Sequence, residues 1–170
     1  MEREDRATAV GVTIRPYRDG DAPALCKLFF RSVRDVGPAK YDDAQVRAWA
    51  AAVPDPTRWA ERMRGSETYV AERDDTIAGW IEFERDGHLD MLYCAPEFAG
   101  RGVAARLYAL AEARARELGV TRFFTDASRF AQSFFRKHGF ALDYHEEIVR
   151  HGVVIQSARM SKTLTQRDES

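Results

Sequence analysis

The spacing of apolar residues divides the chain into a mostly helical first third and a sheet-forming centre, with the change near Gly65. Apolar and polar residues alternate over 12–17, and a period of two is typical of a strand. Three later stretches carry apolar residues three or four positions apart, behind Asp or Pro residues that suit a helix start. We expect helices over 19–32, 42–49 and 56–63.

After Gly65 the alternation returns and continues through three segments. Asp74-Asp75 and Asp86-Gly87 separate these segments, and both dipeptides favour tight turns. Strands that are joined by such short turns run antiparallel. The centre of the chain therefore predicts a meander of strands over 68–72, 77–83 and 88–94.

The last third mixes both periods. A glycine turn at 100–102 precedes an amphipathic stretch that runs to about Leu118 and stops at Gly119, which predicts one long helix. We then expect a strand over 121–125, a short helix over 131–138, and a closing hairpin over 140–149 and 153–160.

Together these elements predict an α+β domain with a mixed, mostly antiparallel central sheet flanked by helices. The length of 170 residues suits one such domain. We place the domain at 12–162, between a disordered N-terminal tail, 1–11, and a C-terminal tail, 163–170.

Composition narrows the functional classes. A net charge of −1 and a pI of about 6.4 give no basic surface, so neither nucleic acid nor a membrane is expected as a partner. Cys26 and Cys94 stand far apart, which argues against a disulfide framework and a zinc site, and no metal is expected. The charged segment 1–11 does not resemble a secretory signal, and no apolar run reaches the ~20 residues that span a bilayer. These features favour a cytoplasmic location.

The glycine turn, Gly100-Arg101-Gly102, carries the first functional signal. Glycines let backbone N–H groups face a ligand, and the start of the next helix adds unpaired donors and the positive end of its dipole. Together they form an anion site that suits a pyrophosphate. The turn also fits a dinucleotide fingerprint, with Ala105 as its third small residue and Asp126 about 20 residues later. The intervening segment 95–99 and the lack of repeated βαβ units argue against that alternative.

Two longer motifs favour coenzyme A. The first is Leu92-x-Cys94-x-Pro96-Glu97-Phe98-x-Gly100-Arg101-Gly102-Val103-Ala104-x-x-Leu107, and the second is Ser128-x-x-Ala131-x-x-Phe134-Phe135-x-x-x-Gly139-Phe140. In this order and spacing they resemble the signature of the GNAT superfamily of N-acetyltransferases, especially its small bacterial YafP-like members. The resemblance covers about 12–162. It implies an enzyme that binds acetyl-CoA and transfers the acetyl group to an amine.

The resemblance also implies where the cofactor lies. Backbone groups of 92–94 would pair with the pantetheine amides, and an N–H there would stabilise the oxyanion of the intermediate. The pyrophosphate would lie over 100–105, where Arg101 adds charge. The cofactor-binding residues expected are Leu92, Tyr93, Cys94, Gly100, Arg101, Gly102, Val103, Ala104, Ala105, Ser128 and Phe135.

The chain departs from the family pattern at three positions. Ala99 replaces a Gln or Arg near the phosphates, and Ser128 replaces an Asn. Phe135 stands where the family often has a Tyr, proposed as the acid for the departing thiolate, and phenylalanine has no proton to give. A thiol of pKa ~8.5 is a tolerable leaving group, so the loss affects a rate factor of ~10²–10⁴ rather than the reaction itself. A non-catalytic acyl-CoA-binding module of the same fold is the alternative function.

The acceptor side needs a base, because an alkyl amine of pKa ~10.4 is protonated at neutral pH. His88 and Asp90 are two residues apart, so we expect both to share a strand face with Leu92 and Cys94. Glu82, on the preceding strand, is the third candidate base.

Two further residues are candidates for contact with the acceptor. Tyr41 lies in the region that should form much of the acceptor wall, and Asp126 ends the strand before the second motif. A small-molecule amine and a protein or peptide amine both fit this composition. The closing hairpin also offers an edge at which two copies of the chain could pair as a homodimer.

Overall fold

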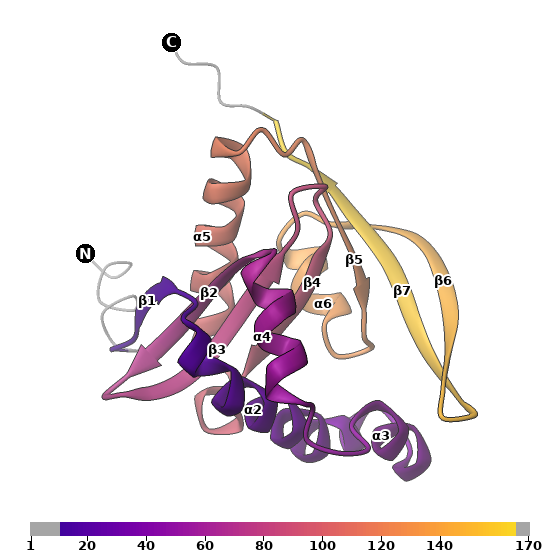
Figure 1. Cartoon of the computed structure of the whole chain (residues 1–170). Helices are drawn as coiled ribbons and strands as arrows, with labels where there is room; N and C mark the ends of the chain where they lie inside the picture. The colour runs from indigo at the N-terminus through magenta and orange to yellow at the C-terminus, as the bar shows by residue number, and fades with distance from the viewer. Residues whose placement is uncertain (1–10, 166–170) are drawn as a thin grey trace.

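The structure, a computed structural model, describes residues 11–165 (Figure 1). Its strands are β1 (Thr13–Pro16), β2 (Glu67–Arg73), β3 (Thr76–Phe83), β4 (Leu89–Cys94), β5 (Arg122–Ala127), β6 (Ala141–Arg150) and β7 (Val153–Thr163). Its α-helices are α2 (Ala22–Val36), α3 (Asp43–Trp49), α4 (Pro56–Arg64), α5 (Val103–Glu117) and α6 (Gln132–Lys137). Short 3-10 turns are η1 (Asp19–Asp21), η2 (Gly37–Ala39) and η3 (Pro96–Phe98).

The strands form two antiparallel sheets with the orders β1-β2-β3-β4 and β5-β7-β6. A parallel bridge between His88 and Phe124 joins them, and Thr125 adds a hydrogen bond from its hydroxyl to the carbonyl of Leu89 (2.8 Å). Over the described residues no ladder pairs the rest of β4 with β5. The backbone edge of β4 beyond this point therefore lacks a strand partner, and its carbonyl at Cys94 accepts a hydrogen bond from the hydroxyl of Ser32 (3.3 Å).

Helices cover both faces of the first sheet. α2 and α4 lie in front of it in the view of Figure 1, and α5 lies behind. Aromatic side chains on the front face pack tightly, since Trp80 of β3 and Tyr93 of β4 stack at 5.2 Å and Trp59 of α4 lies 6.0 Å from Trp80. This packing fixes the position of β4, which carries several of the expected site residues.

The long helix α5 begins and ends where the sequence expects. Gly102 has φ +80° at its start and Gly119 has φ +78° after its end, conformations that favour glycine. The buried residues recur every four positions along one face, namely Val103, Leu107, Ala111 and Ala115. This stripe packs on β3 and aims the start of the helix at the end of β4.

The predicted α+β fold is confirmed, with two differences of detail. The sheet that we expected as one is divided between β4 and β5, because a single bridge joins its halves. The helix expected to stop at Ser32 continues to Val36, since Val33 is buried in the core.

The described chain also runs past the domain limit expected at 162. β7 extends to Thr163, and Leu164 is buried and donates its N–H to the carbonyl of Thr121. The rest of the two expected tails, 1–10 and 166–170, lies outside the described residues. No helix in 11–165 combines the length and the apolar character that a membrane span requires.

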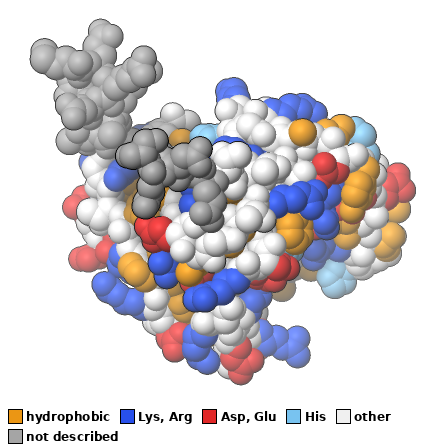
Figure 2. Space-filling view, turned by 90° about the horizontal axis from the view of Figure 1, so that it is seen from above, with side chains coloured by type: hydrophobic (Ala, Val, Ile, Leu, Met, Phe, Trp, Pro, Cys, Tyr) orange, Lys and Arg blue, Asp and Glu red, His pale blue; other side chains and the backbone are white. Residues whose placement is uncertain are grey.

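Surface charge is mixed. On the face seen from above in Figure 2, Lys and Arg side chains are interspersed with Asp and Glu side chains. This pattern agrees with the net charge of −1.

Candidate active site

Two hollows of similar size meet beside β4. The first, which we call the glycine hollow, has a volume of about 570 Å³ and is lined by 92–94, the glycine turn, the start of α5 and the segment 128–138. The second, the carboxylate hollow, has a volume of about 560 Å³ and includes Asp90 and Asp126 in its lining. Trp49, Tyr93 and Ser128 line both hollows. The two hollows are therefore adjacent, and these three residues form their junction.

Backbone N–H groups lie at one end of the largely apolar glycine hollow, where the glycine turn meets α5. Gly100 (φ +73°) and Gly102 (φ +80°) turn the chain into α5, and a Cβ built on either would meet nothing within 4 Å. The first N–H groups of α5 have no partner within the helix and coincide with its positive dipole end. The arrangement suits a phosphate.

Most of the residues expected to bind a cofactor come together here. The lining includes Leu92, Tyr93, Cys94, Gly100, Gly102, Val103, Ala104, Ala105, Ser128 and Phe135. Arg101 is the exception, because its exposed side chain lies outside the lining with its guanidinium 5.9 Å from the centre of the Phe98 ring. Burial raises the pKa of Cys94 to about 11, so its side chain is a neutral thiol at pH 7.

Charged and aromatic side chains dominate the carboxylate hollow. Asp90 forms an ion pair with Arg62 of α4, and Asp126 receives a hydrogen bond from Arg159 of β7 (2.7 Å). The remaining lining residues come from separate parts of the chain; they include Phe29, Tyr41, Trp49, Trp59, Tyr93, Arg150, His151 and the loop 51–54. Carboxylates and aromatic faces both suit a cationic amine.

Asp126 is held in its ionised form. Burial by itself would raise the pKa of this carboxyl, but hydrogen bonds from Arg159 and Glu146 and the charges of Arg159 and His88 together outweigh burial and lower the pKa. Its neighbour Glu146 shows the opposite shift, since its contact with Asp126 raises the pKa of Glu146. Asp126 is therefore a weak base and a fixed negative charge.

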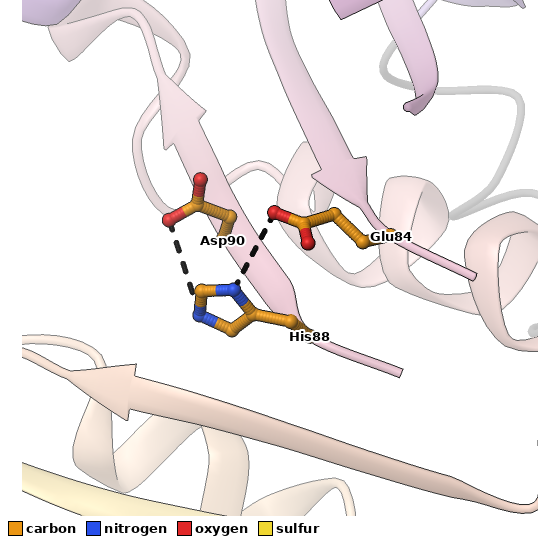
Figure 3. Close-up of side chains that lie close together, drawn as sticks. All are labelled: Glu84, His88 and Asp90. Carbon is orange, nitrogen blue, oxygen red and sulfur yellow. Dashed lines mark ion pairs between the residues drawn. The ribbon is translucent and has the colours of Figure 1, made fainter. Parts of the chain in front are cut away.

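His88 stands next to the carboxylate hollow without lining it. Figure 3 shows its ring between Glu84 and Asp90, at 3.6 Å from the Glu84 carboxylate and 4.0 Å from that of Asp90. Its Nε2 lies 3.9 Å from Asp126, and its ring stacks on Phe124 at 5.1 Å. Three carboxylates thus surround one imidazole, an arrangement that can accept and pass on a proton.

Comparison with known proteins identifies the family. A family model described as an acetyltransferase (GNAT) domain matches residues 38–164. The uncharacterized N-acetyltransferase YafP of Escherichia coli (strain K12) is 35% identical over 129 residues, which cover 76% of this chain and 81% of YafP. The chain belongs to the GNAT family of acetyltransferases. The predicted family, fold and enzyme class are therefore confirmed.

Solved GNAT structures agree with the fold. A GCN5-related N-acetyltransferase from Rhodopseudomonas palustris is 30% identical, with a TM-score of 0.84 over 89% of this chain and 95% of that one. PaiA N-acetyltransferase from Thermoplasma acidophilum, in complex with coenzyme A, has a TM-score of 0.73 at 18% identity and covers 89% of this chain and 98% of its own. A phosphinothricin acetyltransferase from Sinorhizobium meliloti, in complex with acetyl-CoA, has a TM-score of 0.70 at 20% identity, and the match covers 94% of this chain and 92% of that one.

In this GNAT protein, the side chain of Asp90 faces a different hollow from the one that we expected. The expectation that Asp90 shares a face with Leu92 and Cys94 is wrong, because the register between β3 and β4 shifts after Glu82 and leaves Asp90 as an extra residue in β4. Asp90 therefore lines the carboxylate hollow, whereas Leu92 and Cys94 line the glycine hollow.

Glu82 lies outside both linings of this acetyltransferase. Its side chain is fully buried, pairs with Arg62 at 3.2 Å and receives a hydrogen bond from Ser66 at 3.0 Å. The structure therefore gives Glu82 no direct path to an acceptor, and the residue reaches the hollow through Arg62, which also pairs with Asp90.

Tyr41 lines the carboxylate hollow with its ring. Its hydroxyl donates to the carbonyl of Gln156 (3.0 Å) and accepts from the N–H of Arg129 (2.8 Å), so both hydrogen bonds hold the wall of the hollow together.

Sequence reasoning missed Arg62, Arg150 and Arg159 as site residues. Arg159 faces Asp126 as its direct cross-strand partner, a signal that only the register of β5 and β7 provides.

Proposed function

We propose that this GNAT acetyltransferase transfers the acetyl group of acetyl-CoA to a primary amine, by direct attack of the amine on the thioester. The observation that carries the proposal is the junction at Trp49, Tyr93 and Ser128, the residues shared by the lining of a hollow that suits an anionic cofactor and the lining of a hollow that holds carboxylates. The thioester and the amine would meet there.

Acetyl-CoA would occupy the glycine hollow. Its pyrophosphate would lie over 100–105, and its pantetheine arm would pair with the open backbone edge of β4 at 92–94. The coenzyme A and acetyl-CoA complexes of the PaiA and phosphinothricin acetyltransferase structures support this assignment. No step in this scheme needs a metal.

The acceptor would occupy the carboxylate hollow. Its ammonium group is attracted by Asp126, whose lowered pKa keeps it negative, and gives its proton to Asp90 or, through Asp90, to His88. The neutral nitrogen then attacks the carbonyl carbon, and an N–H of β4 stabilises the oxyanion. Collapse breaks the C–S bond and leaves the electron pair on sulfur. The second N–H proton passes to the same bases.

The alternative is an acyl-CoA-binding module without turnover. It is favoured by one observation, the buried Phe135, which contributes an apolar ring to the glycine hollow where many relatives would carry a hydroxyl. This alternative shares the cofactor assignment and differs only in the reaction.

Calorimetric titration with acetyl-CoA, with NAD as the control, tests the cofactor. We expect micromolar affinity for acetyl-CoA and none for NAD. Release of free thiol from acetyl-CoA in the presence of alkylamines, amino acids, an aminoglycoside and a lysine peptide then tests the reaction. Binding without thiol release from any amine would support the non-catalytic module, and absence of binding would overturn both.

A further inference from the structure

The lining of the carboxylate hollow holds as many positive as negative side chains. Asp90 and Asp126 supply the negative charges, and Arg62 and Arg150 supply the positive ones. An acceptor that carries only an ammonium group is attracted by the carboxylates and repelled by the arginines. The partners of each arginine therefore bear on which amines can bind.

The two carboxylates of the lining are each paired with an arginine other than Arg150. Arg62 pairs with Asp90 and also with the buried Glu82 (3.2 Å), so its charge is offset within the protein. Asp126 pairs with Arg159, its direct cross-strand partner on β7 (2.7 Å). Neither carboxylate thus depends on Arg150 for a partner.

Arg150 differs, because its own charge has no partner in the part of the chain that the structure describes. It is the last residue of β6, and its cross-strand neighbour is Val153 rather than an acid. Over 11–165 its side chain forms neither an ion pair nor a hydrogen bond. Burial raises the pKa of Tyr93, and the charge of Arg150 is the largest of the influences that oppose the rise. The hollow therefore presents an unpaired cation within electrostatic reach of the junction.

Most of the remaining lining is apolar. Aromatic and aliphatic side chains form the wall, namely Phe29, Tyr41, Trp49, Val53, Pro54, Trp59, Met91, Tyr93, Ile148 and Ile155. The volume of about 560 Å³ lies in the range of small-molecule sites, which combine apolar walls with a few polar groups that fix orientation. A small ligand that carries both signs of charge would match this arrangement.

We propose that the acceptor is a small amino carboxylate, an amine that also carries a carboxylate group, and that Arg150 binds this carboxylate. This inference rests on the proposed function. The ammonium group would lie towards Asp90 and Asp126, while the planar guanidinium of Arg150 donates two parallel hydrogen bonds to the carboxylate. His151, the next residue in the hairpin turn, also lines the hollow, and its ring N–H can donate another.

The transfer itself is the one proposed above. The N–C bond forms, the C–S bond breaks with its electron pair on sulfur, and the amine protons pass to the bases of the carboxylate hollow. The product is an N-acetyl amino carboxylate. Its carboxylate keeps its charge throughout, so Arg150 acts in binding and not in the chemical step.

The same charges disfavour the other kinds of amine. An aminoglycoside carries several ammonium groups, whereas the two carboxylates of the lining are already paired. A lysine side chain in a protein brings an amine without a carboxylate beside it, and so does an alkylamine. Each of these acceptors would leave the charge of Arg150 without a partner.

Matched acceptors test the class. Glycine, β-alanine, γ-aminobutyrate and ε-aminocaproate place the carboxylate at increasing distances from the amine, and the amide of each keeps the amine and removes the negative charge. In wild type, we expect kcat/KM for the best acid to exceed that for its amide by roughly 10- to 100-fold, as thiol release per unprotonated amine. Equal values for all four pairs would overturn the proposal.

Substitution of Arg150 tests the residue. Arg150→Gln removes the charge from an exposed strand end, and the preference for the acid over its amide should fall by roughly tenfold or more. Arg150→Lys keeps the charge without the planar fork and should retain part of the preference. Arg136→Gln is the matched control, because Arg136 is also exposed, has no side-chain partner within 11–165 and lines neither hollow. An unchanged preference in Arg150→Gln would overturn the role of Arg150.

A binding measurement separates this inference from the proposed function. The best acid is titrated by calorimetry into each protein saturated with coenzyme A, which has no acetyl group to transfer. We expect an affinity roughly tenfold lower in Arg150→Gln than in wild type and Arg136→Gln. Binding that depends on Arg150, without thiol release from acetyl-CoA, would overturn the proposed transfer and keep the ligand class. Equal thiol release with acids and amides, unchanged in Arg150→Gln, would overturn the inference and keep the transfer.

Discussion

The glycine hollow offers backbone N–H groups, whereas the carboxylate hollow offers charged and aromatic side chains. The first is built from two continuous stretches, around the glycine turn and around α6, together with parts of α2, Gly37 and Trp49 of α3. The second is assembled from α2, α3, α4, β4, β5 and both strands of the closing hairpin. Backbone groups can bind the part of a cofactor that does not vary, and side chains from many elements can select among acceptors. The difference between the hollows therefore separates common chemistry from specific recognition.

The largest effect should come from a change in the backbone site. In Gly102→Asp a carboxylate occupies the space over the start of α5 and repels the phosphates, so we expect acetyl-CoA affinity to fall by roughly 100-fold or more, measured by calorimetry. Gly119→Asp is the control, because Gly119 has nearly the same φ (+78° against +80°) and equally open space at the far end of the helix. Equal affinity in the two folded variants would contradict the pyrophosphate assignment.

The framework behind the glycine hollow should respond to acid. Burial alone would raise the pKa of Glu112, but hydrogen bonds from Tyr108, Arg116 and Lys162 outweigh it and lower the pKa to about 2. A lowered pKa in the folded state stabilises the fold above the ordinary value of 4.5, and this contribution is lost as the pH falls towards 2.

Glu112→Gln should therefore lower the free energy of unfolding by about 2 kcal/mol at pH 7, with partial screening by solvent taken into account. Urea unfolding at pH 7 and pH 3 measures the difference, which should shrink at the lower pH. Glu117→Gln, on the exposed side of the same helix, is the control. A difference between wild type and Glu112→Gln that does not change with pH would contradict the ionic role.

A smaller effect, confined to the reaction, is expected in the carboxylate hollow. Asp90→Asn removes a proton acceptor and leaves Arg62 paired with Glu82. We expect kcat/KM for the amine to fall by roughly tenfold, less than for a sole base, because the proton can still reach His88 by way of Asp126, which lies 3.9 Å from its Nε2. Acetyl-CoA affinity should not change. Asp143→Asn, which removes a carboxylate paired with Arg122 on the second sheet, should alter neither quantity.

The smallest effect on function is expected at the wall of the carboxylate hollow. Tyr41→Phe removes the bonds to Gln156 and Arg129 and leaves a carbonyl and an N–H without their partner. The free energy of unfolding should fall by about 1–2 kcal/mol in urea titrations, and acetyl-CoA affinity should stay the same. A loss of acetyl-CoA affinity would show that the two hollows are less separate than their linings suggest.

The two hollows also differ in how far the sequence predicts them. The glycine hollow follows from a contiguous motif, since Gly100, Gly102 and the apolar period of α5 specify turn, helix start and orientation together. Its second wall follows from the motif that begins at Ser128. Ten of the eleven cofactor residues expected from these motifs line the hollow, and only the exposed Arg101 does not.

The carboxylate hollow depends on registers and contacts that local patterns do not encode. Alternation of apolar and polar residues predicted the wrong strand face for Asp90. One extra residue in β4 moves this side chain to the opposite face, and the alternation in the sequence gives no sign of that residue. Glu82 and Asp90 meet Arg62 only because α4 packs on the first sheet, and no spacing in the sequence links 62 to 82 and 90. Residue type alone therefore identified the candidate bases, but the arginines that pair with them could not be predicted from the sequence.

The junction has a consequence for how this family diversifies. Trp49, Tyr93 and Ser128 belong to both linings, and the other residues of the carboxylate hollow do not line the glycine hollow. Under the proposed function, substitutions in the loop 51–54 and at the hairpin tip alter the acceptor site and leave binding of the acetyl donor intact. A substitution at one of the three shared positions affects the binding of both ligands. The preference for an acceptor can therefore change during evolution through residues at the rim of the carboxylate hollow, whereas the three shared positions are the most constrained.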